Sequence, residues 1–484
     1  MEKQISIKKN YIYNLLYQLL TLIVPFITAP YTARIFGADG IGIQSYTNSI
    51  LAYFTLFATL GTASYGQREI ARNKDSRQRR SQLFWEIELL SMTTTGITIL
   101  IWIILIMLSS QYTEYYLVLT ISLIATAFDI SWFFSGQEMF QYIVLRNSVF
   151  KIIGTVLLFT VVREKSDLLL YMALTASTGL LGNLSMWTYL PKFLQKIDFR
   201  SLNIFAHLKD TFTYFIPTIA SSIYTVMDKT MIGLMTNEIE NGYYEQATKI
   251  IRVGQTLLLS LNTVMTSRMS YLFAQGKTEE IKAKIFKSYD FILFMAIPMM
   301  FGVGGMARKF VPWFFGPGYK RTAVILCFLS PLPLVICISN VLGSQYLTPS
   351  GQRARSSKGI IIGACVNFLC NLVLIPELMA VGAAIASLIA EVVISFIYVR
   401  MSNGYITWHK LWRLSWKRFL SGGVMLIGLN VIGNRIDANV FTTFIQIICG
   451  GILYWFLLLG LRDSFCKKMV NNFWALIERR KMEG

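Results

Sequence analysis

Long apolar runs separated by short polar segments dominate the chain. A helix that crosses a bilayer needs about 17 to 25 mostly apolar residues, at about 1.5 Å per residue. Fourteen segments meet this requirement. Their limits are 11–36, 41–65, 82–108, 114–135, 142–162, 167–190, 211–236, 243–267, 288–311, 322–347, 359–376, 380–400, 417–434 and 440–461. The pattern predicts an all-α polytopic membrane protein with about fourteen transmembrane helices.

A basic, amphipathic segment at 191–210 separates the first six spans from the next six. The motifs GIGIQS (40–45) and GYYEQA (242–247) take matching places in the two halves, each with Gly followed by Gln four residues later. This pattern favours a parallel repeat of two six-helix lobes. The predicted divisions are 1–190 for an N-lobe, 191–210 for a cytoplasmic linker, 211–400 for a C-lobe, 401–461 for helices 13 and 14, and 462–484 for a basic cytoplasmic tail.

Two connecting segments carry more specific expectations. Residues 268–290 form an amphipathic pattern, which predicts a separate helix lying between spans. Residues 308–321 combine Pro and Gly with several aromatic side chains, which predicts a re-entrant turn and an interfacial aromatic belt.

Composition and charge support a membrane protein and give it an orientation. The chain is 54% hydrophobic and 15% charged, against about 25% charged residues in soluble domains. Its 45 Lys and Arg residues produce a net charge of +19, but most of them fall in alternate loops. The positive-inside rule therefore predicts that both termini are cytoplasmic, and the charge does not indicate a nucleic-acid partner.

Cysteine and histidine offer little chemistry. The six cysteines lack CxxC spacing, so we expect reduced packing residues and no metal. The two histidines, His207 and His409, fall in predicted cytoplasmic loops, which excludes a histidine relay inside the membrane.

Charged residues inside the spans require an explanation. Asp228 and Lys229 interrupt the seventh span, where a central charge costs about 2.5 to 3.5 kcal/mol on insertion scales. In the eighth span, Glu245, Lys249 and Arg252 share one helical face. Either these groups pair with one another, or they line a hydrated, cationic cavity for an anionic substrate.

Two further charges leave alternatives open. Asp129 in the fourth span either pairs with a cation across the bundle or binds a coupling ion. Arg34 ends a first span that contains Pro25 and Pro30, and it either lines a cavity beside a hinge or extends to the outer interface.

Several stretches together resemble the bacterial oligosaccharide flippases for O-antigen or capsule repeat units, within the multidrug/oligosaccharidyl-lipid/polysaccharide exporter superfamily. These stretches are NLLYQLLTLIVPFITAPYTARIFGADGIGIQSYTNSI, LFATLGTASYGQREIAR, DISWFFSGQEMF, IYTVMDKTMIGLM and GYYEQATKI. The resemblance implies a V-shaped, alternating-access bundle with a lateral gap and a C-terminal helix hairpin. It also implies transfer of an undecaprenyl-diphosphate-linked oligosaccharide to the outer leaflet, with a polysaccharide polymerase and co-polymerase as partners.

Related flippases of lipid-linked precursors carry cavity arginines in the first and eighth spans. The resemblance thus assigns diphosphate binding to Lys249, Arg252 and Arg34, with Lys229 added from its position inside a span. Partners for sugar hydroxyls are expected from the polar side chains of the first two spans, which are Asn14, Gln18, Gln44, Tyr46 and Asn48. Asp228, Asp129 and Glu245 are charge partners, or sites for coupling to H+ or Na+ without another cofactor.

Two other functions are considered, another exporter of the same fold and a membrane enzyme. A lipid II or multidrug exporter would share the fold, although a drug exporter should present an anionic, aromatic cavity. A membrane polysaccharide polymerase or glycosyltransferase should carry a long external loop or an acidic motif at the first external turn. That turn is short here and holds one acid, Asp39, so we expect a transporter rather than an enzyme.

Overall fold

The structure of the chain is a computed structural model that describes residues 7–471. The side chains of residues 7–19, 216, 217, 220, 221, 223, 224, 261, 263 and 264 lie outside this description. The described residues form helices and no strands, which confirms the all-α class. They divide into two compact units, Met1–Gly233 and Leu234–Gly484, called unit 1 and unit 2 below.

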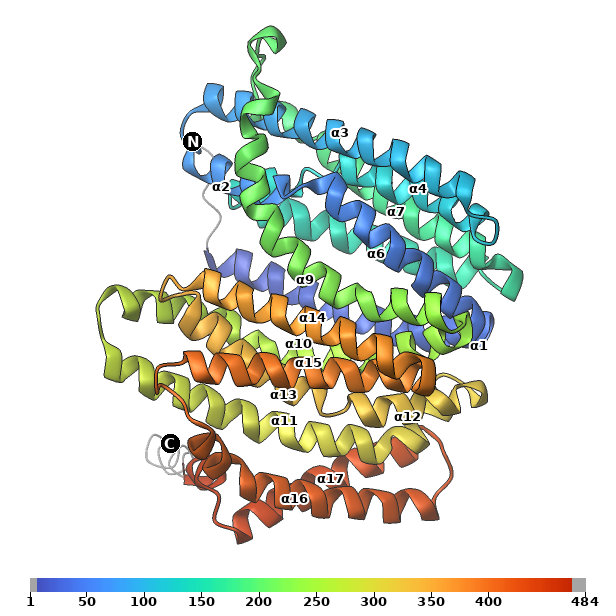
Figure 1. Cartoon of the computed structure of the whole chain (residues 1–484), viewed down its shortest axis with the longest axis vertical. Coiled ribbons are helices and arrows are strands. Elements are labelled where there is room, and N and C mark those ends of the chain that lie inside the picture. Colours follow the sequence, from blue (N-terminus) through green and yellow to red (C-terminus); the bar gives the residue numbers. More distant parts are fainter. Residues whose placement is uncertain (1–6, 472–484) are drawn as a thin grey trace, which may run out of the picture. The chain divides into compact units, whose positions relative to one another are not determined.

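Unit 1 contains the first six predicted spans and most of the seventh (Figure 1). Its short 3-10 turns are Lys165–Asp167, Phe199–Ser201 and Ile204–His207. Its helices are α1 (Ile7–Thr59), α2 (Thr62–Arg72), α3 (Arg77–Leu108), α4 (Thr113–Ala127), α5 (Ser131–Gly136), α6 (Phe140–Val161), α7 (Leu168–Trp187), α8 (Leu190–Phe193) and α9 (Leu208–Met235).

Unit 2 contains the remaining spans. A 3-10 turn lies at Pro317–Tyr319, and a π-helical turn at Gly343–Leu347 extends α13. Its helices are α10 (Glu238–Ala274), α11 (Thr278–Phe314), α12 (Lys320–Leu329), α13 (Leu332–Leu342), α14 (Arg353–Leu378), α15 (Ala380–Met401), α16 (Trp408–Arg435) and α17 (Val440–Gly460). Helix α9 is grouped with unit 1 except for its last two residues, so the division into two six-helix lobes stays a prediction.

The helices correspond well to the predicted spans. Among the described residues, ten helical segments are long and apolar enough to cross a membrane. One of these, Leu20–Arg72, covers both the first and second predicted spans. The chain breaks there at Gly37, whose φ of 68° lies in the left-handed region that favours glycine. Helices α9, α10 and α16 form at the other predicted positions but are not among the ten.

The separate helix expected at 268–290 and the aromatic belt expected at 308–321 were wrong, whereas the re-entrant turn at 308–321 stays a prediction. Residues 268–290 do not form a separate helix but the last turns of α10 and the first turns of α11, joined at Gly276 with a φ of 68°. In segment 308–321, α11 continues to Phe314, and the aromatic side chains of Phe314, Phe315 and Tyr319 are buried. Phe315 meets Phe314 edge-to-face and Tyr319 at a tilted angle in the interior of unit 2, so these rings do not form a lipid-facing belt.

Small residues allow the tightest helix pair of unit 2 to form. Helix α14 packs along α15, and the Cβ atom of a larger residue at Gly359 or Gly363 would meet the side chain of Tyr398 or Ile394. Gly382 of α15 approaches the backbone of α14 itself, at the carbonyl group of Leu374. Glycine therefore sets the separation of these two helices.

We expect Gly382→Ala to lower the unfolding temperature, because its methyl group collides with backbone atoms that cannot rotate away. Overpacking of this kind costs about 1 to 3 kcal/mol. Thermal unfolding of the detergent-purified protein measures the effect. Gly451→Ala is the matched control, since a Cβ atom there meets nothing within 4 Å. Equal melting of the two variants would contradict the close approach of α14 and α15.

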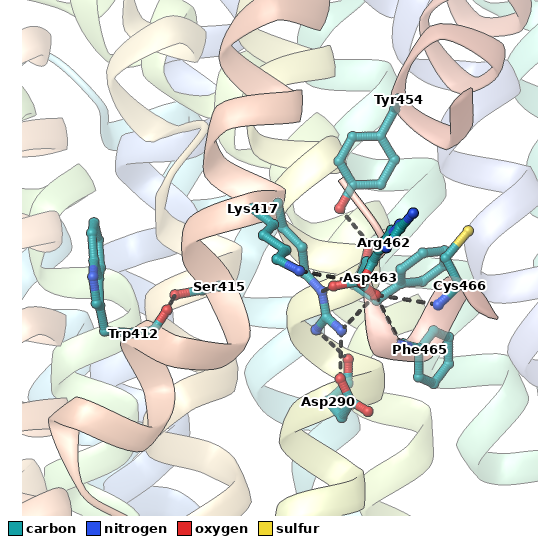
Figure 2. A network of polar contacts seen from close by, with 11 residues as sticks. Asp290, Trp412, Ser415, Lys417, Tyr454, Arg462, Asp463, Phe465 and Cys466 are labelled. Atoms are coloured by element: carbon teal, nitrogen blue, oxygen red, sulfur yellow. Dashed lines mark hydrogen bonds and ion pairs between the residues drawn. The ribbon is translucent and has the colours of Figure 1, made fainter. Parts of the chain in front are cut away.

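The C-terminal hairpin of α16 and α17 packs against α11 (Figure 1). A fully buried guanidinium, Arg418 of α16, connects the three elements at one end of the hairpin. It forms an ion pair with Asp290 of α11, donates to the Asp290 carbonyl oxygen at 2.7 Å, and pairs with Asp463 beyond α17 at 3.3 Å. Figure 2 shows Asp290 and Asp463 converging from separate segments, beside Phe465 and Cys466.

Candidate functional site

Two adjoining cavities open inside unit 1. The first, called the hydroxyl cavity, has a volume of about 320 Å³ and is lined mainly by serine and threonine side chains. Its lining residues are Thr55, Thr59, Thr62, Ala63, Ser91, Ser122, Ala125, Thr126, Asp129, Ser131, Trp132, Thr175, Ala176, Gly179 and Asn183. This is a polar space within a bundle of apolar helices, of the kind that binds a polar ligand.

The second, called the cation cavity, has a volume of about 270 Å³ and lies between α6 and α7. It is lined by Arg146, Asn147, Phe150, Lys151, Thr175, Thr178, Gly179, Gly182 and Asn183. Thr175, Gly179 and Asn183 of α7 line both cavities. The two spaces therefore meet along one face of α7.

The guanidinium of Arg146 stands where the two cavities meet. It donates a hydrogen bond to the amide oxygen of Asn183, and the Asn183 nitrogen donates to the Ala125 carbonyl oxygen at 2.6 Å. The Asp129 carboxylate lies 4.0 Å away and also accepts from the Ser131 N–H at 3.0 Å. Asp129 thus lies at ion-pair distance from a cation of α6, and its role as a site for a coupling ion stays a prediction.

Lys151 is the twelfth residue of the 22-residue helix α6. It is partly buried and lines the cation cavity, but no ion pair or side-chain hydrogen bond to it occurs among the described residues. A lysine at this depth of a spanning helix is costly unless an anion or water meets it.

A buried carboxyl lies behind the hydroxyl cavity. Glu88 of α3 is 1% exposed and accepts a hydrogen bond of 3.3 Å from the indole nitrogen of Trp132. Its other oxygen, Oε1, has no hydrogen-bond partner within the described structure. Trp132 also stacks on Phe84 with ring centres 5.7 Å apart, so its ring is held from two directions at the cavity wall.

The predicted cations of unit 1 lie elsewhere. Arg34 has an exposed side chain on α1, while Lys229 on α9 is partly buried next to the buried Asp228. The following residue, Thr230, donates to the Ser49 hydroxyl at 2.9 Å. This contact places the charged pair of α9 beside the second half of α1.

The predicted sugar-binding residues divide into three groups. Asn14 and Gln18 lie outside the described side chains. Gln44 is partly buried, and Asn48 is exposed and donates to the Gln44 carbonyl oxygen at 2.7 Å. Tyr46 is buried against Tyr112 and Gly233, so the structure gives its ring a packing role.

The predicted charges of unit 2 lie together on α10. Lys249 pairs with Glu245 at 3.6 Å, as the four-residue spacing predicts. Arg252, one turn further, is exposed and has no ion pair within the described part of the chain. Part of this group is thus neutralised within α10, and Arg252 is not.

Sequence reasoning missed Arg146, Lys151 and Glu88. Both cations lie inside the predicted span 142–162 as well as inside α6, but their charge is attributed to the cytoplasmic side in the positive-inside interpretation and not to a cavity. The missed signal is the stretch LRNSVFK, which places Arg146, Asn147 and Lys151 on one side of a helix that is otherwise apolar. Within the described range, no group of three or more His, Cys, Asp or Glu residues gathers in a way that would hold a metal ion.

A family model described as "Polysaccharide biosynthesis protein" matches residues 7–273, more than half of the 484 residues. The chain belongs to this family. Its relatives include a protein of Escherichia coli (strain K12) named "Putative O-antigen transporter". That protein is 23% identical over 399 residues, which cover 81% of this chain and 95% of the relative.

Other similarities reach archaea and solved structures. A Haloferax volcanii protein named "Probable low-salt glycan biosynthesis flippase Agl15" is 22% identical over 265 residues, 52% of this chain and 54% of its own length. The solved structure "Lipid II flippase MurJ, inward closed conformation" superposes with a TM-score of 0.72 at 18% identity. The superposition covers 94% of this chain and 99% of that one, so the two proteins share a fold.

Proposed function

We propose that this protein is a flippase that moves a lipid-linked oligosaccharide from the inner to the outer leaflet of the bacterial plasma membrane for polysaccharide assembly. The observation that carries the proposal is a polar, partly cationic interior within an apolar bundle. Membership of the polysaccharide biosynthesis family and the names of the relatives, a transporter and a flippase, support this function. Alternating access between two lobes, with cytoplasmic termini, is the corresponding mechanism.

The substrate that fits these features carries a diphosphate on undecaprenol. Moving the negative charge of the diphosphate through the bilayer core costs the most free energy, and cations inside the bundle lower this cost. Lys249, Arg252, Lys229 and Arg34 are the residues we assign to it. Among them Arg252 is favoured, because it is exposed and has no ion pair in the described structure.

Coupling and partners extend the proposal. Asp228, Asp129 and Glu245 are the acids that could couple transport to H+ or Na+, and Glu245 and Asp129 lie within 4.0 Å of a cation. A polysaccharide polymerase and its co-polymerase would use the flipped product. A lipid II exporter is the alternative favoured by a specific observation, the fold shared with a lipid II flippase.

The content of lipid-linked oligosaccharide in cells depleted of the protein tests the proposed function. We expect a complete repeat unit to accumulate, confined to the cytoplasmic leaflet when access from outside is probed. The mass of the accumulated lipid identifies the glycan. A truncated glycan would indicate an enzyme, accumulation of lipid II would favour the alternative, and an unchanged lipid pool would overturn the proposal.

We expect the double variant Lys249→Ala, Arg252→Ala to lose most of the transport while the protein remains folded. Removing charge-assisted contacts to a diphosphate costs about 1.5 to 3 kcal/mol each, or at least a tenfold loss in affinity. Translocation of the lipid-linked substrate in proteoliposomes measures the loss. Lys277→Ala with Lys287→Ala is the control, since both lysines are exposed and unpaired in the described structure. Full transport by the double variant would remove these two residues from the site.

A further inference from the structure

We propose that the two cavities of unit 1 together bind the head group of the lipid-linked substrate. The phosphates lie in the cation cavity at Arg146 and Lys151, and the first sugar lies in the hydroxyl cavity beside Trp132. This assignment rests on the proposed function. It gives the head group a second binding position, on α5, α6 and α7, distinct from the one assigned above to the cations of α1, α9 and α10.

The charge balance of the combined cavity requires an anion. Three ionisable side chains line the two spaces, namely Arg146, Lys151 and Asp129. Asp129 lies 4.0 Å from Arg146, and its side chain is 43% exposed, so it offsets one cation incompletely. Lys151 has no counterion within the described structure. A phosphate in the cation cavity would supply the missing negative charge, and charge-assisted hydrogen bonds are the strong ones.

The Arg146 side chain is already held in position to bind a phosphate. The amide of Asn183 accepts from one of its nitrogens, and the same amide is fixed by the Ala125 carbonyl oxygen. A guanidinium that is already held loses little side-chain entropy when it binds a phosphate. Lys151 adds a second cation on the same side of α6, which suits a group with two phosphates.

The hydroxyl cavity is arranged to accept hydrogen bonds. Thr59, Thr62, Thr126 and Thr175 each donate to a carbonyl oxygen three or four residues earlier. Their hydroxyl protons are therefore used, while their oxygen lone pairs remain for donors from a ligand. A sugar ring carries many hydroxyl donors and apolar C–H faces. Trp132, which donates to Glu88, stacks on Phe84 and is 5% exposed, contributes a fixed apolar edge to the wall of this cavity.

The order of the two cavities matches the order of groups in the substrate. In a glycosyl diphosphate the first sugar is bonded directly to phosphate. In unit 1 the cation cavity is joined directly to the hydroxyl cavity through Thr175, Gly179 and Asn183. Gly179 leaves the junction open, because a Cβ atom there would meet nothing within 4 Å.

Binding to the purified protein in lipid nanodiscs tests the cation cavity. The probes are undecaprenyl diphosphate, undecaprenol and inorganic pyrophosphate. We expect Lys151→Gln to weaken undecaprenyl diphosphate binding about tenfold or more and to leave undecaprenol unchanged. Lys151→Arg should restore binding, and Lys287→Gln, at an exposed and unpaired lysine, should match the unaltered protein. Pyrophosphate that binds as tightly as the lipid would indicate a site for free phosphate and overturn the lipid assignment.

A steric variant tests the connection between the cavities. Gly179→Leu is chosen to fill the junction, because its Cβ atom would meet nothing within 4 Å, and we expect the variant to fold and still to bind undecaprenyl diphosphate. It should fail to translocate the same lipid when a sugar is attached. Gly96→Leu on α3 is the control, because a Cβ atom there also meets nothing within 4 Å and Gly96 lines neither cavity.

The outcomes separate this inference from the proposed function. If the unaltered protein translocates the lipid-linked oligosaccharide and both Lys151→Gln and Gly179→Leu behave like it, the inference fails while the flippase proposal stands. If the unaltered protein moves no lipid-linked oligosaccharide, the flippase proposal itself fails.

Discussion

Arg418→Met is expected to destabilise unit 2 severely and to detach the C-terminal hairpin from α11. The guanidinium is 0% exposed and neutralises two buried carboxylates, those of Asp290 and Asp463. Removing one member of a buried ionic cluster costs about 3 to 5 kcal/mol, because the remaining charges stay buried without compensation. We expect little folded protein in detergent, measured by size-exclusion chromatography and thermal unfolding.

The rate at which Cys466 is alkylated measures whether the C-terminal hairpin detaches from α11. Its thiol is buried next to Asp463, and burial raises the pKa of this thiol above its ordinary value, so alkylation at pH 7 to 8 should be slow. The positive charge of Arg418 acts in the opposite direction and lowers this pKa. Loss of Arg418 alone would therefore slow alkylation. Faster alkylation of Cys466 in Arg418→Met would show that the hairpin has opened.

Two further variants make the result decisive. Arg413→Met removes an exposed arginine from the same helix and should leave stability and Cys466 unchanged. Adding Asp290→Asn and Asp463→Asn to Arg418→Met removes the uncompensated charges and should recover part of the lost stability. If Arg418→Met melts like the unaltered protein, the buried cluster does not hold the hairpin.

The fold class could be predicted because it depends on the lengths of apolar runs along the sequence. Runs of about 20 apolar residues suffice to recognise spanning helices, and the structure places a helix at every predicted span. Contacts made within one helix were also predictable, as the pairing of Glu245 with Lys249 shows.

Contacts between distant segments could not be predicted in this way. Arg418 lies 128 residues from Asp290 and 45 residues from Asp463, so no local pattern links them. In the sequence Arg418 stands at the start of the predicted span 417–434, directly after a basic segment. The aromatic residues of 308–321 were misassigned for the same reason, because their burial depends on tertiary packing in unit 2.

Only some residues of the candidate site could be predicted from the sequence. Charges in the middle of long apolar runs, such as Asp228 and Lys229, were easy to find. Lys151 falls inside the predicted span 142–162, but the sequence does not show which neighbours meet its side chain, so its place in a cavity between α6 and α7 became clear only from the structure. The position of a cation along one helix therefore does not tell whether its side chain faces a cavity, a neighbouring helix or the outside of the bundle.

The second large effect is expected at the segment that follows α8, where Glu86→Leu should release residues 195–207 from α3. Glu86 accepts from the Asn203 N–H at 3.1 Å and contacts the His207 Nε2 at 2.9 Å. The other ring nitrogen of His207 meets the Tyr65 hydroxyl at 2.8 Å. Leucine removes the acceptor of the Asn203 N–H and the group that meets the buried His207 ring, and a buried polar group left without a partner costs about 1 to 3 kcal/mol.

Limited trypsin digestion of inverted membrane vesicles measures this release, since the segment contains Lys196 and Arg200 and its predicted position is cytoplasmic. We expect cleavage at these two residues to become about tenfold faster or more, in proportion to the population of the open segment. Glu86→Gln keeps one acceptor and should have a smaller effect. Glu279→Leu, at an exposed glutamate of α11, should have none. Unchanged cleavage in Glu86→Leu would mean that the contacts of Arg77 with the Lys192 and Leu194 carbonyl oxygens hold the segment by themselves.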